Sequence, residues 1–293
     1  MNISCFSTGK YMGKKAQEKF KIIKLFSTYG KFGIIVILSM LFIGIVSILF
    51  MGNSYKIPSG RSLEAPSLVH LLGTDDLGID LLAQICHGAV VSILVGFCSA
   101  ALAGIGGSIF GILSGYYGGW MDKLVMGICD TLMVIPQLPL MIILGALFGP
   151  SIKNIVLVIA LLSWSRPARI VRSKVLSMRH ERYITASQSY GAGFLHLVVK
   201  HFLPGVFPIM MVSVIGTISH AIRAEASLSF LGLGDPTSKS WGVILNRSIN
   251  FKGIYFTDYW KWWVMAPLSM LILLVLSISF VSRDMEKVAN KKL

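Results

Sequence analysis

Long apolar runs alternate with shorter polar segments along the chain. A helix needs about 20 mostly apolar residues to cross a hydrocarbon core about 30 Å thick. Six segments approach or meet this requirement, at about residues 32–52, 88–115, 124–148, 155–165, 206–224 and 262–282. The fourth is the shortest because Arg166, Pro167 and Arg169 interrupt it, and we expect it to begin near Ile152 and to continue past Arg166. The pattern predicts an all-α integral membrane protein with six transmembrane helices.

The distribution of basic residues predicts which loops face the cytoplasm, because short cytoplasmic loops are enriched in Lys and Arg. Residues 1–31 carry seven lysines and one acidic residue, and residues 166–204 carry seven Lys or Arg and one acidic residue. Residues 53–87 instead carry two basic and four acidic residues. We therefore expect a protein of the cell membrane with both termini in the cytoplasm. Outside loops are expected at about residues 53–87, 149–153 and 232–261.

The composition agrees with a membrane protein and argues against other classes. Apolar residues make up 54% of the chain and charged residues 14%, which is far from the balance of soluble domains. The net charge is +14, and the basic residues cluster in the segments that separate the apolar runs. We therefore expect a lipid bilayer, and no nucleic acid, as partner. We divide the chain into a basic cytoplasmic segment, residues 1–31, and a six-helix transmembrane domain, residues 32–293.

Motifs of catalysis are missing from the sequence. It contains no Gly-x-x-x-x-Gly-Lys-Ser/Thr phosphate loop and no His-Glu-x-x-His pattern. We therefore expect no catalytic residue, no cofactor and no metal site in this chain.

The polar segment between the fourth and fifth spans, at about residues 172–204, is too long for a simple turn. Residues 172–189 are a plausible helix, which Gly191 and Gly193 interrupt, and a second short helix is expected over residues 194–202, ended by Pro204. This pattern predicts a helix-turn-helix on the cytoplasmic membrane surface. The alternative is a basic loop that lies on anionic lipid, and charge alone does not separate the two.

Small residues recur every four positions in the second span, at Ala103, Gly107, Gly111 and Gly115. They share one helical face and allow the backbone of another helix to approach closely. That helix belongs either to this chain or to a second subunit.

Several polar residues are expected at membrane depth. Asp130 lies in the third span, and His220, Arg223 and Glu225 lie near the end of the fifth. Such groups need partners or water, so we expect them to face the protein interior. Asp130 either lines a solute pathway or forms a structural hydrogen bond near Pro136, where the helix backbone needs support. Arg223 and Glu225 are candidates for an ion pair.

The segment between the fourth and fifth spans also carries a recognisable spacing. It contains Tyr183-Ile184-Thr185-Ala186-Ser187-Gln188-Ser189-Tyr190-Gly191-Ala192 and then His201-Phe202-Leu203-Pro204. This run resembles the cytoplasmic coupling motif of ABC importer permeases, in which Glu-Ala-Ala precedes a Gly and then Leu-Pro. Thr185 replaces the family's Glu and Ser187 its second Ala, so coupling here is expected to depend more on shape and apolar contact than on an ion pair.

Three further stretches extend the resemblance to the dipeptide, oligopeptide and nickel permeases. Residues 70–78 resemble the segment before the second span, although Ile79 stands where the family usually has Arg. Residues 115–122 resemble the next tight cytoplasmic link, and residues 225–234 with 240–242 resemble the stretch after the fifth span. By this resemblance, the chain is similar to the second of two different permease subunits.

The resemblance implies an ATP-driven importer that works by alternating access. A second, different permease would enclose the solute with this chain, and an extracytoplasmic solute-binding protein would deliver it. Two ABC ATPase subunits would bind ATP and Mg. The solute would be a short peptide, or nickel or a nickel chelate. The alternative is an ATP-independent secondary transporter or channel, which composition and span count also allow.

Three groups of candidate residues follow from motif and position. The ATPase-coupling residues are Tyr183, Thr185, Ala186, Ser187, Gly191, Phe202, Leu203 and Pro204. The pathway or gate candidates are Asp130, Arg223, Glu225 and Ser229. Asp75 and Asp76, in the first outside loop, are either a docking surface for a basic patch on the solute-binding protein or a solvated acidic turn.

Overall fold

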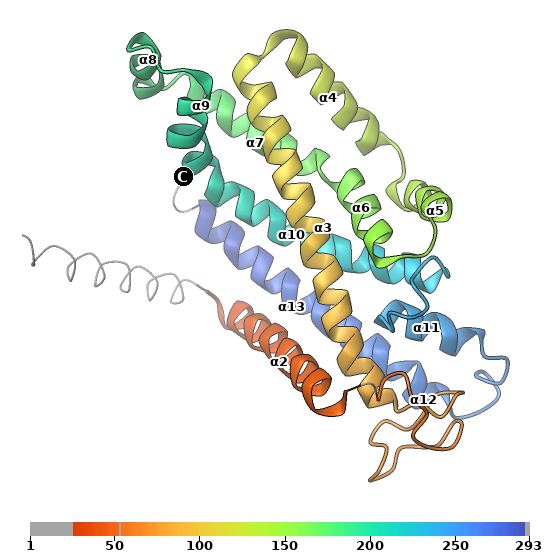
Figure 1. The fold of residues 1–293 in the computed structure, drawn as a ribbon. Coiled ribbons are helices and arrows are strands. Elements are labelled where there is room, and N and C mark those ends of the chain that lie inside the picture. Colours follow the sequence, from red (N-terminus) through yellow and green to blue (C-terminus); the bar gives the residue numbers. More distant parts are fainter. Residues whose placement is uncertain (1–25, 53, 291–293) are drawn as a thin grey trace, which may run out of the picture.

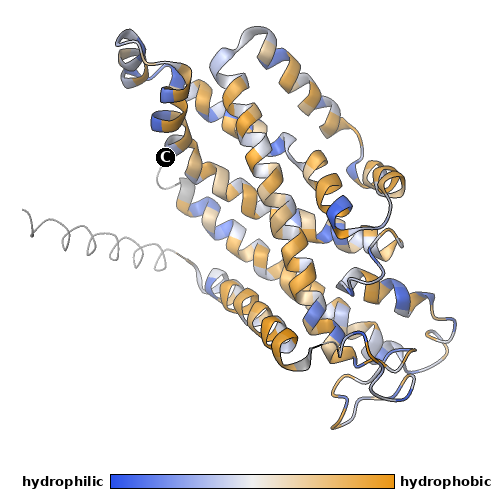
Figure 2. Cartoon of the chain, in the orientation of Figure 1, coloured by the Kyte–Doolittle hydropathy of each residue, from blue (hydrophilic) through white to orange (hydrophobic). Residues whose placement is uncertain are grey.

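The computed structural model describes residues 26–52 and 54–290, so most of the basic N-terminal segment lies outside the described residues. Within these ranges the fold is helical, and the only strand-like pairing is an isolated bridge between Thr74 and Asp80. Figure 1 shows long helices packed side by side, with α8 and α9 at one end of the bundle and α11 and α12 towards the other. The apolar colouring follows the long helices, which agrees with a membrane domain (Figure 2).

Four helical segments are long and apolar enough to cross a membrane: Thr28–Phe50, Leu81–Tyr117, Phe194–Phe230 and Trp260–Val288. They correspond to α2 (Thr28–Met51), α3 (Leu81–Tyr117), the run of α9 (Phe194–Leu197), η1 (Val198–Phe202) and α10 (Leu203–Phe230), and α12 (Trp260–Trp263) with α13 (Met265–Asn290). Two bent helix pairs raise the count to six if each pair is one span. The all-α membrane fold is confirmed.

The third predicted span is not one straight helix. It consists of α4 (Gly119–Val134) and α5 (Gln137–Phe148), which meet at an angle of 97°. The break falls at Ile135 and Pro136, because a residue before proline is driven away from the helical region, and Ile135 has an extended ψ of 131°. The sequence pattern predicted the apolar length of this segment but not the bend between α4 and α5.

The fourth span has a milder bend of 41° between α6 (Ile152–Ser163) and α7 (Ser165–Arg179). Pro167 lies in the first turn of α7 and has no N–H to donate to the preceding turn, which accounts for the interruption near Trp164. The predicted start near Ile152 and the continuation past Arg166 are both correct.

The small residues of α3 pack against α7 of the same chain. A Cβ added at Gly107 would lie 2.6 Å from the carbonyl oxygen of Trp164, and one added at Gly111 would lie 2.6 Å from that of Ala168. An added Cβ at Gly115 would lie 2.9 Å from the Val175 side chain. These glycines therefore allow contact between two spans within this chain, and they are not free to pack on a second subunit.

Helices α2 and α13 are joined near the ends of the described chain. Asp284 of α13 accepts hydrogen bonds from the backbone N–H and the hydroxyl of Ser27, at 2.8 and 2.6 Å. Ser27 in turn caps α2 by accepting from the N–H of Gly30. The first and last spans are therefore linked by polar contacts as well as by packing.

Candidate coupling surface and solute pathway

The predicted helix-turn-helix exists, with boundaries that differ from the sequence prediction. Helix α7 ends at Arg179, and α8 covers Arg182–Ser189, so residues 172–189 do not form one helix. The turn contains Gly191 in the left-handed region, with φ of +82°, which glycine adopts without steric cost.

Pro204 does not end the second helix. It lies in the first turn of α10, and η1, a π-type turn, connects α9 to α10 without interruption. Proline lacks an N–H, so one backbone hydrogen bond is missing here, and the π-type turn directly before it, in which the N–H of Leu203 donates to the carbonyl of Val198, accommodates the ring. The result is one helical segment of 37 residues, Phe194–Phe230.

An apolar cluster holds this cytoplasmic segment to the membrane helices. Ile184 of α8, Leu197 of α9 and Phe202 of η1 are fully buried. They pack with residues of α3, α7 and α10, including Val175 and Val206. Because tightly packed groups move together, α8, α9 and the cytoplasmic ends of α7 and α10 form one mechanical unit.

The opposite face of the segment is exposed and hollowed. A cavity of about 640 Å³ lies between α8 and the following turn, with Ser187 Oγ 3.2 Å from Nε2 of His201. Tyr190 stands beside it with 93% of its surface exposed. Of the predicted coupling residues, Tyr183, Ala186, Ser187 and Gly191 line this hollow.

The other predicted coupling residues have different positions. Phe202 is buried in the apolar cluster, so it supports the surface from within. Leu203 and Pro204 are exposed at the start of α10. Thr185 is exposed on α8 and donates only to the carbonyl of Glu181. The outer face of α8 thus lacks a carboxylate at this position and offers a hydroxyl instead.

A second cavity, of about 820 Å³, lies among the membrane helices where both bent spans are broken. The α4–α5 break contributes Ile135, Pro136 and Gln137, and the α6–α7 break contributes Ser163, Ser165 and Arg166. One face of α10 completes the wall through residues at helical spacing: Ile209, Val212, Ser213, Gly216, Thr217 and His220. Glu286 of α13 also lines it. We call this space the membrane cavity.

The lining of the membrane cavity combines apolar residues with several polar ones. Ser163 and Ser213 have buried hydroxyls that form no hydrogen bond with another described residue. Arg166 forms no ion pair with a described residue. Polar groups at membrane depth are costly unless they face a polar ligand or a water-filled space. The cavity is therefore suited to a polar solute.

The sequence analysis named other residues for the pathway. Asp130 pairs with Arg169 of α7, and its side chain is 59% exposed on the surface of the chain. Arg223 donates to Ser219 at 2.9 Å and does not pair with Glu225, so the proposed ion pair is wrong. Neither Asp130 nor Arg223 lines the membrane cavity.

Glu225 and Ser229 are packed inside the chain. Glu225 is 2% exposed, and it accepts hydrogen bonds from Ser229 at 2.7 Å and from Ser92 of α3 at 3.5 Å. A Cβ at Gly242 would lie 2.7 Å from the Cβ of Ser229. Glu225 and Ser229 are therefore buried in this conformation, where they connect α3, α10 and the start of α11 (Trp241–Asn250).

Asp75 is not available as a docking residue. Its side chain is fully buried and accepts from the backbone N–H groups of Leu77 and Ile79, each at 2.9 Å, and from Gln84 at 2.9 Å. Asp76 is partly exposed and binds Arg247 of α11. The predicted acidic surface is therefore largely neutralised within the chain.

Residues 107–292 match the family described as binding-protein-dependent transport system inner membrane component. The chain belongs to this family. It is 34% identical over 281 residues to a dipeptide transport system permease protein, DppC, of Alkalihalophilus pseudofirmus, a match covering 94% of this chain and 90% of that relative. It is 30% identical over 282 residues to the oligopeptide transport system permease protein OppC of Bacillus subtilis, covering 96% and 90%.

A third relative is the glutathione transport system permease protein GsiD of Pectobacterium atrosepticum, 37% identical over 189 residues, or 64% of this chain and 63% of the relative. The resemblance to ABC importer permeases of the peptide branch is confirmed. This permease is a multi-pass membrane protein and a transport component rather than an enzyme.

Sequence reasoning missed most of the membrane cavity. The spacing of Ser213, Thr217 and His220 places three polar residues on one face of an otherwise apolar span, and this signal is readable from the sequence. Gln137, Ser163 and Arg166 come from two other spans. Their approach to α10 depends on how the bent pairs pack, which periodicity does not describe.

Proposed function

We propose that this chain is a permease subunit of an ATP-driven importer of short peptides. The observation that carries the proposal is the continuous segment Phe194–Phe230. Its α9–η1 end contributes His196 and His201 to the exposed hollow, and its α10 part contributes Ser213, Thr217 and His220 to the membrane cavity. A displacement of the surface unit is thereby passed along this helical segment, through η1 and past Pro204 and Pro208, to the cavity wall.

The partners proposed for this mechanism are a second, different permease, two ABC ATPase subunits and an extracytoplasmic solute-binding protein. The exposed hollow at α8 supports an ATPase subunit as the partner there, because Tyr190 and Leu195 present large exposed side chains beside it. ATP and Mg would be bound by the ATPase subunits. The excess of basic residues over 166–204 supports a cytoplasmic position for this surface, with both termini on the same side.

Short peptides are the proposed solutes. The relatives described above are named for dipeptides, oligopeptides and glutathione. The membrane cavity has a volume within the range of about 300–1,000 Å³ that holds small ligands. Its hydroxyl, amide and guanidinium groups match the carbonyl, N–H and carboxylate groups of a peptide. Transport of nickel or a nickel chelate, the other solute implied by the sequence, has no comparable support here.

The proposal is tested by purifying the tagged chain in mild detergent from its native membrane. Mass spectrometry of copurifying proteins should identify a second permease and ATPase subunits, and the complex should hydrolyse ATP. Proteoliposomes that contain the complex should take up a labelled dipeptide only with ATP and the binding protein present. Purification of the chain alone, together with ATP-independent uptake, would contradict the importer.

A further inference from the structure

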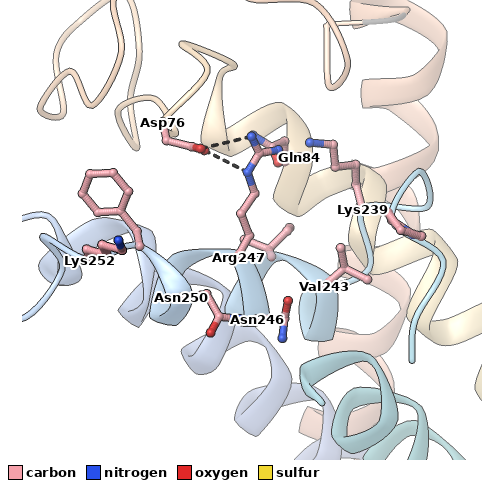
Figure 3. Close-up of a pocket in the computed structure, with 11 residues that line it drawn as sticks. Asp76, Gln84, Lys239, Val243, Asn246, Arg247, Asn250 and Lys252 are labelled. Carbon is pink, nitrogen blue, oxygen red and sulfur yellow. Dashed lines mark hydrogen bonds and ion pairs between the residues drawn. The ribbon is translucent and has the colours of Figure 1, made fainter. Parts of the chain in front are cut away.

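A third cavity, of about 620 Å³, lies between the first long loop and α11, and it shares no lining residue with the membrane cavity. Figure 3 shows Asp76 of the loop, Gln84 of α3, Arg247 of α11 and Lys239 coming together at this cavity. The polar and charged residues of the lining are Asp76, Gln84, Lys239, Asn246, Arg247, Asn250 and the exposed Lys252. We call it the Lys239 cavity.

The acidic groups at the Lys239 cavity already have partners. Nη2 of Arg247 donates to Oδ2 of Asp76 at 3.2 Å, and Nε lies 2.8 Å from Oδ1 as an ion-pair contact, although Oδ1 accepts no hydrogen bond from a described residue. Asp75 is satisfied by Gln84 and two backbone N–H groups, with Arg247 a further 3.9 Å away. Neither carboxylate therefore needs a further cation.

Lys239 lacks such a partner. It is 8% exposed, and its ammonium forms no hydrogen bond or ion pair with a described residue. In Figure 3 the Lys239 side chain extends towards the Arg247 guanidinium from the side opposite Asp76. Burial lowers the pKa of Lys239, and the charge of Arg247 lowers it further, while Asp75 and Asp76 act in the opposite direction. The ammonium nitrogen is not enclosed by protein atoms but reaches the cavity, so Lys239 presents an unpaired cation there.

The backbone conformation of Lys239 is also strained. Its φ is +52°, in the left-handed region that lysine rarely adopts. The segment is pressed against α3, where a Cβ added at Gly88 would lie 2.8 Å from the Lys239 carbonyl oxygen. Strain of this kind persists where the surrounding packing imposes it and is frequent at binding sites.

The chemistry that completes this arrangement is a carboxylate. An incoming carboxylate would accept from the Lys239 ammonium in a charge-assisted hydrogen bond, which is stronger than a neutral one. Asn250 of α11 supplies an amide group suited to a peptide unit, whereas the Asn246 amide donates to the carbonyl of Phe230. Val243 and Phe251 supply apolar surface. The volume is that of a small-ligand site and not of a protein interface.

We propose that the Lys239 cavity binds the carboxylate of a small molecule of dipeptide size, with Lys239 as its main cationic contact. The assignment of that molecule to the transported solute rests on the proposed function. The carboxylate site itself rests on the geometry of the loop and α11.

The test is calorimetric titration of the full-length chain in lipid nanodiscs, with whatever subunits copurify and without ATP. The probes are dialanine and dialanine amide, which differ only in the carboxylate. The wild-type chain should bind dialanine at least about tenfold more tightly than the amide. Lys239→Met should remove this preference, and Lys239→Arg should retain most of it.

Lys261→Met is the matched control, because Lys261 is exposed and pairs with Asp258 away from the cavity. It should bind dialanine like the wild type. A melting temperature of Lys239→Met near or above that of the wild type would show that the variant folds. Equal affinity of the wild type for dialanine and its amide, or an unchanged preference in folded Lys239→Met, would overturn the proposal.

The outcome is separable from that of the importer. If dialanine binding depends on Lys239 and no ATPase copurifies with the chain, this site is supported and the proposed function is rejected. If ATPases copurify and dialanine binding does not depend on Lys239, the proposed function is supported and this site is rejected. If Lys239→Met weakened only the capture of the solute-binding protein, a protein contact would replace the small-ligand site, and the proposal would be overturned.

Discussion

Arg172 of α7 donates from Nε to Oδ1 of Asp122 in α4 at 2.6 Å, and its Nη2 binds the second carboxylate oxygen. Asp122 also accepts from Ser114 near the end of α3. The ion pair therefore ties the tight α3–α4 link to the helix that leads into the coupling segment. This is a structural reason for an acidic residue at the end of the 115–122 stretch.

Asp122→Asn is expected to destabilise the chain by about 1.5–3 kcal/mol, because Arg172 loses a charged acceptor in a partly buried site. The loss should appear as a lower melting temperature of the purified transporter. Asp258→Asn is the control, since it breaks the exposed Asp258–Lys261 pair and should change stability by less than about 1 kcal/mol. Equal effects of the two variants would contradict the prediction.

Gly111→Ala is expected to destabilise the packing of α3 on α7 by about 1–3 kcal/mol, because the added methyl group has no room against the Ala168 backbone. Gly106→Ala, on the same helix, has no atom within 4 Å of the added Cβ and should be tolerated. Thermal denaturation of both variants in the same detergent provides the comparison. If the two variants were equally stable, α3 and α7 would pack less tightly than they do in this structure.

Gly191→Val is expected to reduce dipeptide uptake per ATP hydrolysed while the chain remains inserted. A β-branched residue is strained at φ of +82°, so the turn beside the hollow must change shape. Gly193→Val is the matched control, because Gly193 has an ordinary φ of −73° and open space around it. Uptake and ATP hydrolysis measured in the same proteoliposomes give the ratio, and an unchanged ratio for Gly191→Val would exclude this role of the turn.

Glu225→Ala is expected to lower the amount of folded permease, because it leaves the hydroxyls of Ser92 and Ser229 without their acceptor in a buried site. The remaining folded protein should transport dipeptide with an unchanged apparent KM. Glu225→Gln retains an acceptor and should be milder. A raised KM in Glu225→Gln at normal stability would instead place this residue in contact with the solute.

Gly216→Phe is expected to block dipeptide uptake, because its side chain would fill part of the membrane cavity. Only the Ser282 hydroxyl lies within 4 Å of an added Cβ at Gly216, at 3.7 Å, so the variant should fold. Met211→Phe, on an exposed part of α10 outside the cavity lining, is the control. ATP hydrolysis should persist in both variants, and normal uptake by Gly216→Phe would show that the solute passes elsewhere.

The sequence by itself determined the class of this protein and the location of its coupling segment. Apolar length and charge are properties of consecutive residues, so they identified six membrane segments and the polar segment between the fourth and the fifth. The spacing from Tyr183 to Pro204 identified the coupling motif for the same reason. These inferences depend on which residues follow one another and not on which ones meet.

Tertiary structure alone decided which polar residues are available to bind a solute or a partner protein. Asp75 and Asp76 read as an exposed acidic pair, yet α11 brings Arg247 against them, and Lys239 nearby forms no ion pair with a described residue. Asp130 is paired with Arg169, whereas Ser163 and Arg166 reach the membrane cavity because two spans are bent. The physical reason is that charge compensation and cavity lining arise between residues that are distant in sequence, and the packing of the helices determines which of them come within contact distance.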